Sequence, residues 1–393
     1  MKTMQEAPIR LRLSILADQL GSPVGGGRFV QGFIAALLSD SSIVDRLGAV
    51  DIVVTQNESV SCLGPLPPRV SIVRRRFPTR LRHTPVAALF GYALPAADVA
   101  FGPFFYTFPL RARVRVVTVH DLSVFNEQYH PPVGARKIGA QLTRMVNDCD
   151  GVVCISDTTL REFKNHWPHH AHKAVMIYNG VSPSATQLHR PKPVPDRSIL
   201  AVGTIEPRKN YPVLLDAFER LALEQGDTAP VLTVVGHVGW MSESAERRLL
   251  ALQSAGRCQW LRNASDERLA EAYAKAGVFT YLSLSEGFGY PPFEAAYARC
   301  PMVLSSASSV GEIWAGHARC VDPLDVEATV AAWKWALSLS SAEREAVVAR
   351  QERRAREFTW SRAVNEYMAF WNGLLSKDGT VLDCGNSERG QRQ

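Results

Sequence analysis

The fold of this chain is decided by residues 277–299, which read GVFTYLSLSEGFGYPPFEAAYAR. The apolar run that opens this stretch predicts a buried strand, and the glycines after Glu286 predict a tight turn at the end of that strand. Proline fixes φ and lacks an N–H that would be unpaired in the first turn of a helix. We therefore expect a helix that begins at Pro291 or Pro292 and places Glu294 in its first turn.

Glu286 and Glu294 flank seven residues, and we expect both carboxylates to face one crevice. The N–H groups at the start of a helix over 292–299 favour an anion such as a phosphate. Carboxylates accept hydrogen bonds from hydroxyls, so a nucleotide sugar suits the combination. Taken alone, the same pair is also explained by a surface turn residue and an ordinary charge at a helix start.

Several segments of the chain resemble the GT-B retaining glycosyltransferases of family four, in particular their mannosyltransferase-like members. In chain order, these segments are Gly25-Gly26-Gly27-Arg28, which resembles the glycine loop of the family's first domain, Val117-Thr118-Val119-His120-Asp121, residues 201–210 (AVGTIEPRKN), residues 234–240 (VVGHVGW) and residues 283–312. The resemblance covers roughly residues 10 to 375 and is most specific between Gly203 and Glu312.

The resemblance implies an α/β fold of two doubly wound Rossmann-like domains that face a central cleft. A length of 393 residues fits two such domains, and short β-rich runs alternate with helical patterns along the chain. We expect an acceptor-side domain over 1–182, a linker over 183–197, a nucleotide-sugar donor domain over 198–359, a C-terminal helix over 360–376 that crosses back onto the first domain, and a disordered tail over 377–393.

The resemblance also implies roles for individual residues. The catalytic roles fall on Glu286, His120, Arg208 and Lys209, with the two cations at the departing diphosphate. The donor-binding roles fall on Gly26, Gly27, Thr204, Gly236, Gly287, Phe288, Gly289, Tyr290 and Glu294, of which Glu294 binds the ribose hydroxyls. Many relatives carry arginine where this chain has Thr204, so either Arg208 substitutes for it or the diphosphate has one cation fewer.

No D-x-D motif occupies a loop after a strand, so we expect no metal and no cofactor, with the nucleotide sugar as a substrate. The resemblance implies retention of the anomeric configuration. The sequence offers no secure carboxylate nucleophile, because the direction of Asp121 is unknown. We therefore expect same-face attack in which the leaving phosphate takes the proton of the acceptor hydroxyl. A glycosidase pair is disfavoured, since Glu294 at a helix start lies towards the nucleotide.

We expect transfer of mannose from GDP-mannose to a saccharide or lipid-linked saccharide in surface polysaccharide or lipopolysaccharide synthesis. A UDP-sugar donor stays open, because the base contacts near 236–240 and 261–264 cannot be read from sequence. Two further functions of the same fold also stay open, namely a non-catalytic nucleotide-sugar-binding protein and a nucleotide-sugar epimerase.

Composition places the chain among globular proteins, with 46% hydrophobic and 21% charged residues. No apolar run approaches the roughly 18 to 20 residues that span a bilayer, and residues 1–6 form no apolar signal core, so we expect a cytoplasmic protein. Seven cysteines without paired spacing predict reduced thiols and argue against a disulfide framework or a zinc site.

Charge is distributed unevenly along the chain. Residues 1–190 hold 21 Lys and Arg against 13 Asp and Glu, with arginines concentrated in 69–83 and 111–115. This basic half predicts either a peripheral contact with anionic lipid at the inner face of the membrane or a solvated surface. Nucleic-acid binding is disfavoured, because no stacking aromatics interleave with the arginines and no nucleic-acid-binding motif is present.

Overall fold

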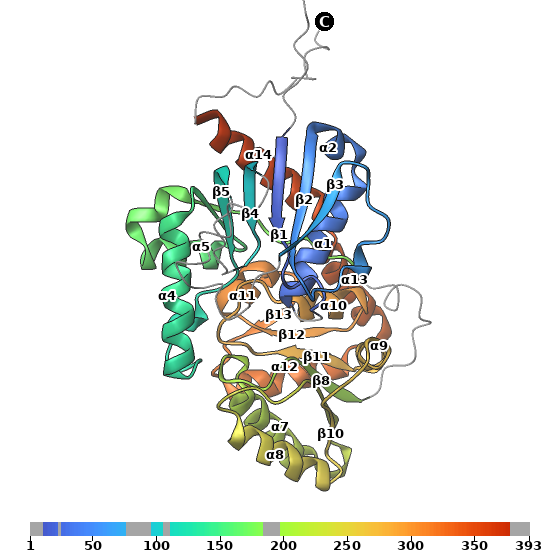
Figure 1. The fold of residues 1–393 in the computed structure, drawn as a ribbon. Helices are drawn as coiled ribbons and strands as arrows, with labels where there is room; N and C mark the ends of the chain where they lie inside the picture. Colours follow the sequence, from blue (N-terminus) through green and yellow to red (C-terminus); the bar gives the residue numbers. More distant parts are fainter. Residues whose placement is uncertain (1–10, 23–24, 76–95, 105–110, 184–196, 378–393) are drawn as a thin grey trace, which may run out of the picture.

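The computed structural model of the protein describes residues 11–22, 25–75, 96–104, 111–183 and 197–377. Within these residues two parallel β-sheets, each flanked by helices, lie one above the other (Figure 1). The predicted architecture of two doubly wound α/β units is confirmed.

The first sheet has the strand order β3-β2-β1-β4-β5-β6-β7 over the described residues. Its strands are β1 (Leu11–Leu16), β2 (Leu47–Thr55), β3 (Val70–Arg75), β4 (Ala97–Gly102), β5 (Ala112–Val119), β6 (Gly151–Cys154) and β7 (Ala174–Met176). Its helices are α1 (Gly25–Ser39), α2 (Ser41–Arg46), α4 (Pro132–Asp148) and α5 (Asp157–His166), with short 3₁₀ turns η1 (Ser61–Leu63), η2 (Ser123–Phe125) and η3 (Pro168–Lys173).

The second sheet has the order β10-β9-β8-β11-β12-β13 in the described part of the chain. Its strands are β8 (Ser198–Val202), β9 (Val231–Val235), β10 (Cys258–Leu261), β11 (Val278–Tyr281), β12 (Met302–Ser305) and β13 (Arg319–Val321). The helical segments are η4 (Pro207–Lys209), α7 (Tyr211–Gln225), η5 (Gly226–Thr228), α8 (Glu243–Ser254), α9 (Asp266–Lys275), α10 (Tyr290–Tyr297), α11 (Ser308–Trp314), α12 (Val326–Ser338), α13 (Ser341–Ala355) and α14 (Trp360–Lys377).

The strand order fixes where a ligand site can form. In both sheets the order reverses between two neighbouring strands, β1 and β4 in the first and β8 and β11 in the second. Loops at the carboxyl ends of such a pair diverge and leave a crevice, which is where ligands gather in doubly wound sheets. The predicted strand at 277–282 is β11, buried along its whole length, so residues 283–289 form one of these loops.

The C-terminal helix α14 packs on the first sheet, as expected (Figure 1). The Tyr367 ring lies 5.1 Å from that of Phe33 between centroids, and the Tyr367 hydroxyl lies 2.9 Å from Thr118 Oγ1 on β5. Trp371 is fully buried in the same core. Helix α14 therefore completes the core of the first domain.

Two local expectations are wrong. The helix expected over 292–299 is α10, which runs over Tyr290–Tyr297. Proline is tolerated anywhere in the first turn, where N–H groups lack partners, so the two prolines occupy its second and third positions and Glu294 its fifth. The Gly25–Gly27 segment, expected as a loop, is the first turn of α1.

Some predicted features lie largely outside the described residues. These are the predicted linker over 183–197, the predicted tail over 377–393, and the arginines at 76, 80 and 82.

Candidate active site

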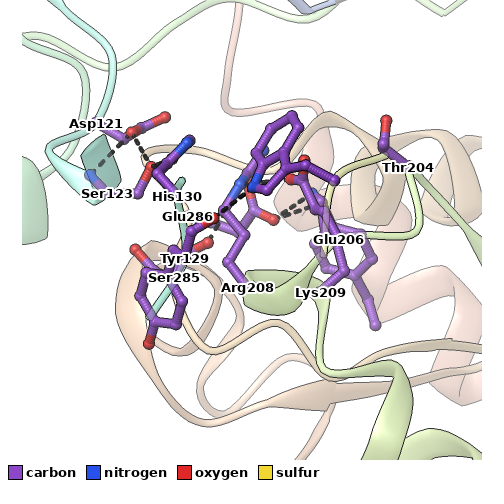
Figure 2. Close-up of polar contacts among 12 residues, drawn as sticks. Asp121, Ser123, Tyr129, His130, Thr204, Glu206, Arg208, Lys209, Ser285 and Glu286 are labelled. Atoms are coloured by element: carbon purple, nitrogen blue, oxygen red, sulfur yellow. Dashed lines mark hydrogen bonds and ion pairs between the residues drawn. The ribbon is translucent and has the colours of Figure 1, made fainter. Parts of the chain in front are cut away.

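The loops after β8 and β11 bring together the cationic and acidic residues singled out from the sequence. Arg208 Nη1 donates to Glu286 Oε2 at 2.8 Å, and Arg208 Nε lies 2.6 Å from Glu206 Oε1. Lys209 Nζ pairs with Glu286 Oε1 and donates to the Tyr281 hydroxyl at 2.5 Å. That hydroxyl donates in turn to Glu286 Oε1 at 2.9 Å. We define the charge cluster as Glu206, Arg208, Lys209, Tyr281 and Glu286, and Figure 2 labels its four charged members.

Burial and neighbouring charges set the ionisation of the cluster. Burial raises the pKa of Glu286, but Arg208 and Lys209 outweigh it and hold that pKa at about 2. Burial lowers the pKa of Lys209, with Arg208 adding to the shift and Glu286 opposing it. Burial raises the pKa of Glu206 above its usual range, against the attraction of both cations. Glu286 is therefore ionised at neutral pH, and Glu206 is the carboxyl of the cluster that gains a proton most readily.

The first domain meets the cluster at Gly287. A Cβ at this position would lie 1.6 Å from the His120 carbonyl oxygen and 3.3 Å from Asp121 Cβ, so only glycine fits. The Asp121 carboxylate accepts from Ser123 N at 3.0 Å and from Ser123 Oγ at 2.6 Å. Burial lowers the pKa of Arg208, but the charges of Glu286 and then Asp121 outweigh burial and raise that pKa. Asp121 of the first domain therefore interacts electrostatically with the charge cluster of the second domain.

The His120 imidazole lies in the wall of the first domain. It stacks on Phe104 with centroids 5.2 Å apart and meets Phe29 edge-on at 5.0 Å. Its Nε2 lies 2.7 Å from the Pro103 carbonyl oxygen, and burial lowers its pKa. The neutral ring therefore donates to that carbonyl through Nε2, and its role at the sugar stays a prediction.

Glu294 lies in a second group of side chains, apart from Glu286. It pairs with Arg28 of α1, across the two domains, and accepts from the Tyr273 hydroxyl at 2.8 Å. A cavity of about 270 Å³ adjoins this pair and is also lined by Tyr290. The two carboxylates share no partner in the described residues, and the single crevice expected between them stays a prediction.

The remaining donor-binding candidates fall into three places. Gly26 and Gly27 pack tightly in the first turn of α1, where a Cβ on Gly27 would lie 1.8 Å from the Ser22 carbonyl oxygen. Phe288 is a core side chain, stacked on Phe293 at 4.8 Å, so only its backbone can contribute to a ligand site. Gly289, at φ 81°, is the N-cap of α10.

Thr204 and Gly236 lie at the carboxyl ends of the neighbouring strands β8 and β9. Thr204 Oγ1 is 3.4 Å from His237 Nε2, and a Cβ on Gly236 would lie 2.0 Å from the Gly203 carbonyl oxygen. The Gly236 N–H donates to the Leu261 carbonyl at 3.1 Å, so the two segments expected near the base adjoin. Their contact with a donor stays a prediction.

The contacts of Trp240 with the first domain were not predicted from the sequence. Trp240 Nε1 donates to the Tyr129 carbonyl at 2.5 Å, and the Trp240 and His130 rings stack 5.0 Å apart. His130 Nε2 lies 3.1 Å from Ser123 Oγ. An indole beside a glycine turn is a weak signal in sequence, because its partner lies 111 positions away.

Several arginines of the basic first domain have partners in the protein. Arg74 donates to the carbonyls of Gln56 and Glu58 at 3.0 Å each. Arg113 lies 3.6 Å from Asp98, and Arg115 lies 3.6 Å from Asp150. Part of the positive charge of the first domain is therefore paired within the protein and stabilises local structure.

None of the helices in the described ranges is long and apolar enough to cross a membrane. In the same ranges no three His, Cys, Asp or Glu side chains gather in a way that could hold a metal ion. The described cysteines are free thiols, as expected, and four of them are buried: Cys149, Cys154, Cys258 and Cys300.

Family models match both halves of the chain. Residues 47–185 match the model described as Glycosyltransferase Family 4, and residues 187–354 match the model described as Glycosyl transferases group 1. The chain is 29% identical over 277 residues to O-antigen chain mannosyltransferase B of Escherichia coli, with 67% of this chain and 71% of the relative covered.

Other relatives share shorter segments or the fold. The serotype-specific mannosyltransferase WbdA of Escherichia coli is 37% identical over 140 residues, which is 35% of this chain and only 17% of that relative. A solved structure described as trehalose-6-phosphate from E. coli bound with UDP-2-fluoro glucose has a TM-score of 0.68 at 15% identity, with 92% of this chain and 98% of that chain covered. The two matched models and the shared two-sheet architecture show that this chain is a glycosyltransferase, and it belongs to family four of the GT-B fold.

Proposed function

We propose that the chain transfers mannose from GDP-mannose to a saccharide or lipid-linked saccharide acceptor during the synthesis of O-antigen lipopolysaccharide. The observation that carries the proposal is the pairing of Arg208 and Lys209 with Glu286 at the reversal point of the second sheet. The names of the relatives, O-antigen chain mannosyltransferase B and WbdA, support mannose and O-antigen.

In this proposal Arg208 and Lys209 stabilise the departing diphosphate. Transfer breaks the bond between the anomeric carbon and the phosphate oxygen, so negative charge grows on the phosphate. Arg208 offers a planar fork of donors and Lys209 a compact point charge, both largely buried and so little screened. The two side chains take the place of a metal ion in the proposed reaction.

Glu286 lies on the sugar side of those cations. Positive charge develops at the anomeric carbon, and an ionised carboxylate at this position stabilises it. We propose attack by the acceptor hydroxyl on the face that the diphosphate leaves, with its proton passing to the departing phosphate oxygen. The anomeric configuration is then retained without a covalent enzyme intermediate.

Glu294 binds the ribose hydroxyls in the proposed complex, so its carboxylate must exchange part of its present contacts for contacts with the ribose. The carboxylate is paired with Arg28 and hydrogen-bonded to Tyr273. A carboxylate has about four acceptor positions, so it can keep the Tyr273 bond while it accepts from hydroxyls. Arg28, in the first turn of α1, would then no longer be the main partner of Glu294.

A UDP-sugar is the second candidate donor, because the solved structure with the same fold holds UDP-2-fluoro glucose. Guanine and uracil differ in size and in hydrogen-bonding groups, so the loops 236–240 and 261–264 decide between them. GDP remains the first choice because of the mannosyltransferase relatives.

The proposal includes a peripheral contact with anionic lipid, because a lipid-linked acceptor would bring the enzyme to a membrane. The support is the positive charge of the first 190 residues, although Arg74, Arg113 and Arg115 have partners in the protein.

A thermal-shift panel of GDP, UDP, ADP and TDP tests the donor. A ligand that binds only the native state raises stability by mass action, so we expect GDP to raise the melting temperature most. We expect Arg208→Ala to lose this response, whereas Arg220→Ala, an exposed arginine on α7, keeps it. Product analysis with GDP-mannose and a saccharide should show a mannosylated acceptor. A larger shift with UDP, or GDP-mannose consumed to an epimer without acceptor, would contradict the proposal.

A further inference from the structure

A second, larger cavity opens between the domains beside the charge cluster. It has a volume of about 830 Å³, within the roughly 300 to 1,000 Å³ typical of small-molecule sites. One wall is formed by η2, the loop that follows it and α5, and the other by the loops after β11 and β12. Ser285, in the second wall, accepts from Arg208 Nη1 at 3.3 Å through its carbonyl. The cavity therefore reaches the cations that are expected to hold the donor.

Figure 2 places three side chains of this cavity next to the cluster. Ser123 and Tyr129 come from the first domain and Ser285 from the second. Ser123 donates to Asp121, whose Cβ lies 3.3 Å from where a Cβ on Gly287 would be. A molecule in the cavity would thus approach the sugar end of the donor site from the side opposite the nucleotide position at Glu294.

The lining is rich in neutral polar groups. Hydroxyls come from Ser123, Thr158, Ser306 and Ser308, and amides from Asn126 and Asn165. Asn126 uses Oδ1 to accept from the backbone of Gln128 at 2.9 Å, which leaves its NH₂ group for a ligand. Phe125 and Tyr129 add aromatic surface, whose faces suit the C–H groups of a sugar ring.

Two of the charged residues at the cavity are engaged. Glu312 accepts four hydrogen bonds, from Asp157 N, Thr158 N, Thr158 Oγ1 and the Tyr178 hydroxyl, at 2.6 to 2.8 Å. Arg161 lies 3.4 Å from Asp157 and donates to Thr158 Oγ1 at 3.2 Å. Such a lining offers no concentrated positive charge for a phosphate and no continuous apolar surface for a lipid chain.

Glu162 is the third charged residue and differs from the other two. In the part of the chain that the structure describes, it forms neither a hydrogen bond nor an ion pair with another residue. Partial burial raises its pKa, and the charge of Asp121 raises it further, while Arg161 opposes the shift. Its carboxyl group is therefore an available hydrogen-bonding partner on the wall formed by α5.

Closure of the domains shapes this cavity. Tyr129, at its edge, is bonded through its carbonyl to Trp240 of the second domain. Glu312 joins α11 to the start of α5 across the same gap. The two walls are thus held in place by contacts that exist only while the domains are together.

We propose that this cavity is the acceptor subsite, that it takes the terminal sugars of an uncharged saccharide, and that Glu162 selects the acceptor by hydrogen-bonding to its hydroxyls. The inference rests on the proposed glycosyl transfer, because an acceptor subsite has a function only if a sugar is transferred. Glu162 acts here on binding of the acceptor and has no part in holding the donor.

The test compares Glu162→Ala and Glu162→Gln with Lys164→Ala, an exposed residue of the same helix outside the cavity. The probes are fluorescently tagged mannobiose and mannotriose at saturating GDP-mannose. We expect Glu162→Ala to raise the acceptor KM by about ten-fold or more, because a hydrogen bond to a charged group is lost. Glu162→Gln keeps an acceptor oxygen and should show a smaller rise. Lys164→Ala should match the parent.

A second readout separates this inference from the proposed function. GDP-mannose affinity, measured by calorimetry without acceptor, should be the same in all four proteins and also shows that the variants are folded. Transfer with an unchanged acceptor KM in Glu162→Ala would overturn the acceptor assignment alone. A parent enzyme that binds GDP-mannose but neither binds nor mannosylates these saccharides would overturn the choice of an uncharged saccharide. A parent that does not bind GDP-mannose would instead contradict the proposed function.

Discussion

At the residue scale, Glu286 is held by more partners than a simple sugar contact needs. Arg208, Lys209 and Tyr281 all reach its two oxygens, and the hydroxyl of Ser309 donates to its backbone carbonyl at 2.9 Å. These bonds fix the carboxylate in place before any ligand arrives, which is the preorganisation that stabilises a developing charge. The same bonds also neutralise much of the positive charge that a diphosphate would use.

Glu286→Gln should therefore separate binding from transfer. The substitution removes one negative charge but keeps the shape, so Arg208 and Lys209 become freer for the diphosphate and GDP should bind as tightly or more tightly. Transfer should fall by about 100-fold or more, because the carboxylate no longer stabilises the positive charge at the anomeric carbon. Glu294→Gln serves as the control, with a raised donor KM expected and a smaller effect on kcat. Unchanged kcat in Glu286→Gln would remove this residue from the assigned role.

Donor binding should also be linked to proton uptake by Glu206. Burial already raises the pKa of this carboxyl, and an anionic diphosphate beside it raises the pKa further. Because the bound state then holds more protons, affinity for GDP-mannose should increase as the pH falls from about 8 to about 5.5. Calorimetry in two buffers of different ionisation enthalpy measures the uptake directly. Glu206→Gln should abolish the proton uptake. Equal uptake in that variant would show that a group other than Glu206 takes up the proton.

The sequence predicted the charged residues of the site but not their neighbours. Arg208, Lys209 and Glu286 follow apolar strands in recognisable turns, so their positions at strand ends could be read from the pattern. Tyr281 fits the apolar pattern of a strand, so the sequence gives no sign of a polar role. Its hydroxyl belongs to the site because the fold brings Lys209, 72 positions away, next to it. The pairing of Glu294 with Arg28 was likewise beyond prediction, because it depends on how the two domains close.

At the element scale, α5 of the first domain is capped by a residue of the second. The N–H groups of Asp157 and Thr158 donate to Glu312 at 2.8 and 2.7 Å, in addition to the cap in which Thr159 N donates to Ser156 Oγ at 3.1 Å. The first N–H groups of a helix have no partner within the helix, so a carboxylate there is favourable. Contact between the two domains therefore stabilises the first turn of α5.

Glu312→Ala should loosen this helix start and weaken the contact between domains. We expect a loss of about 1 to 3 kcal/mol in the free energy of unfolding, because a cap and buried hydrogen bonds are removed. Hydrogen exchange should quicken at the amides of Asp157 and Thr158. Ser340→Ala, which removes a capping box within the second domain, should lower stability without that local effect. Unchanged exchange at α5 in Glu312→Ala would refute the coupling.

Elements with a clear local signal were predicted, and those without one were not. A serine followed by two acidic residues, as at 265–267, is a recognisable helix start, and the Ser265 hydroxyl accepts from Arg268 N at 3.3 Å at the start of α9. The strands β7 and β13 have only three residues each, too few for a periodic pattern. The early start of α10 escaped prediction because Gly289, expected in the turn, adopts the left-handed backbone of an N-cap.

At the scale of the whole molecule, several contacts among the described residues hold the two domains around the cleft, and four of them adjoin the candidate site. These are the pair Arg28–Glu294, the contact of Trp240 with Tyr129 and His130, the cap of α5 by Glu312, and the approach of Gly287 to His120. Helix α14 also links the domains, because it follows the second domain in the chain and packs into the core of the first. The family resemblance predicted this two-domain arrangement, but the particular closing contacts follow from side chains that no local pattern relates.

The most direct test of the account is a crystal structure of the protein with GDP-mannose. We predict that the diphosphate lies within hydrogen-bonding distance of Arg208 and Lys209, that the ribose hydroxyls contact Glu294, and that the mannosyl ring lies between Glu286 and the cavity at Glu162. A donor bound with its diphosphate away from both cations, or on the outer surface of either domain, would contradict the account.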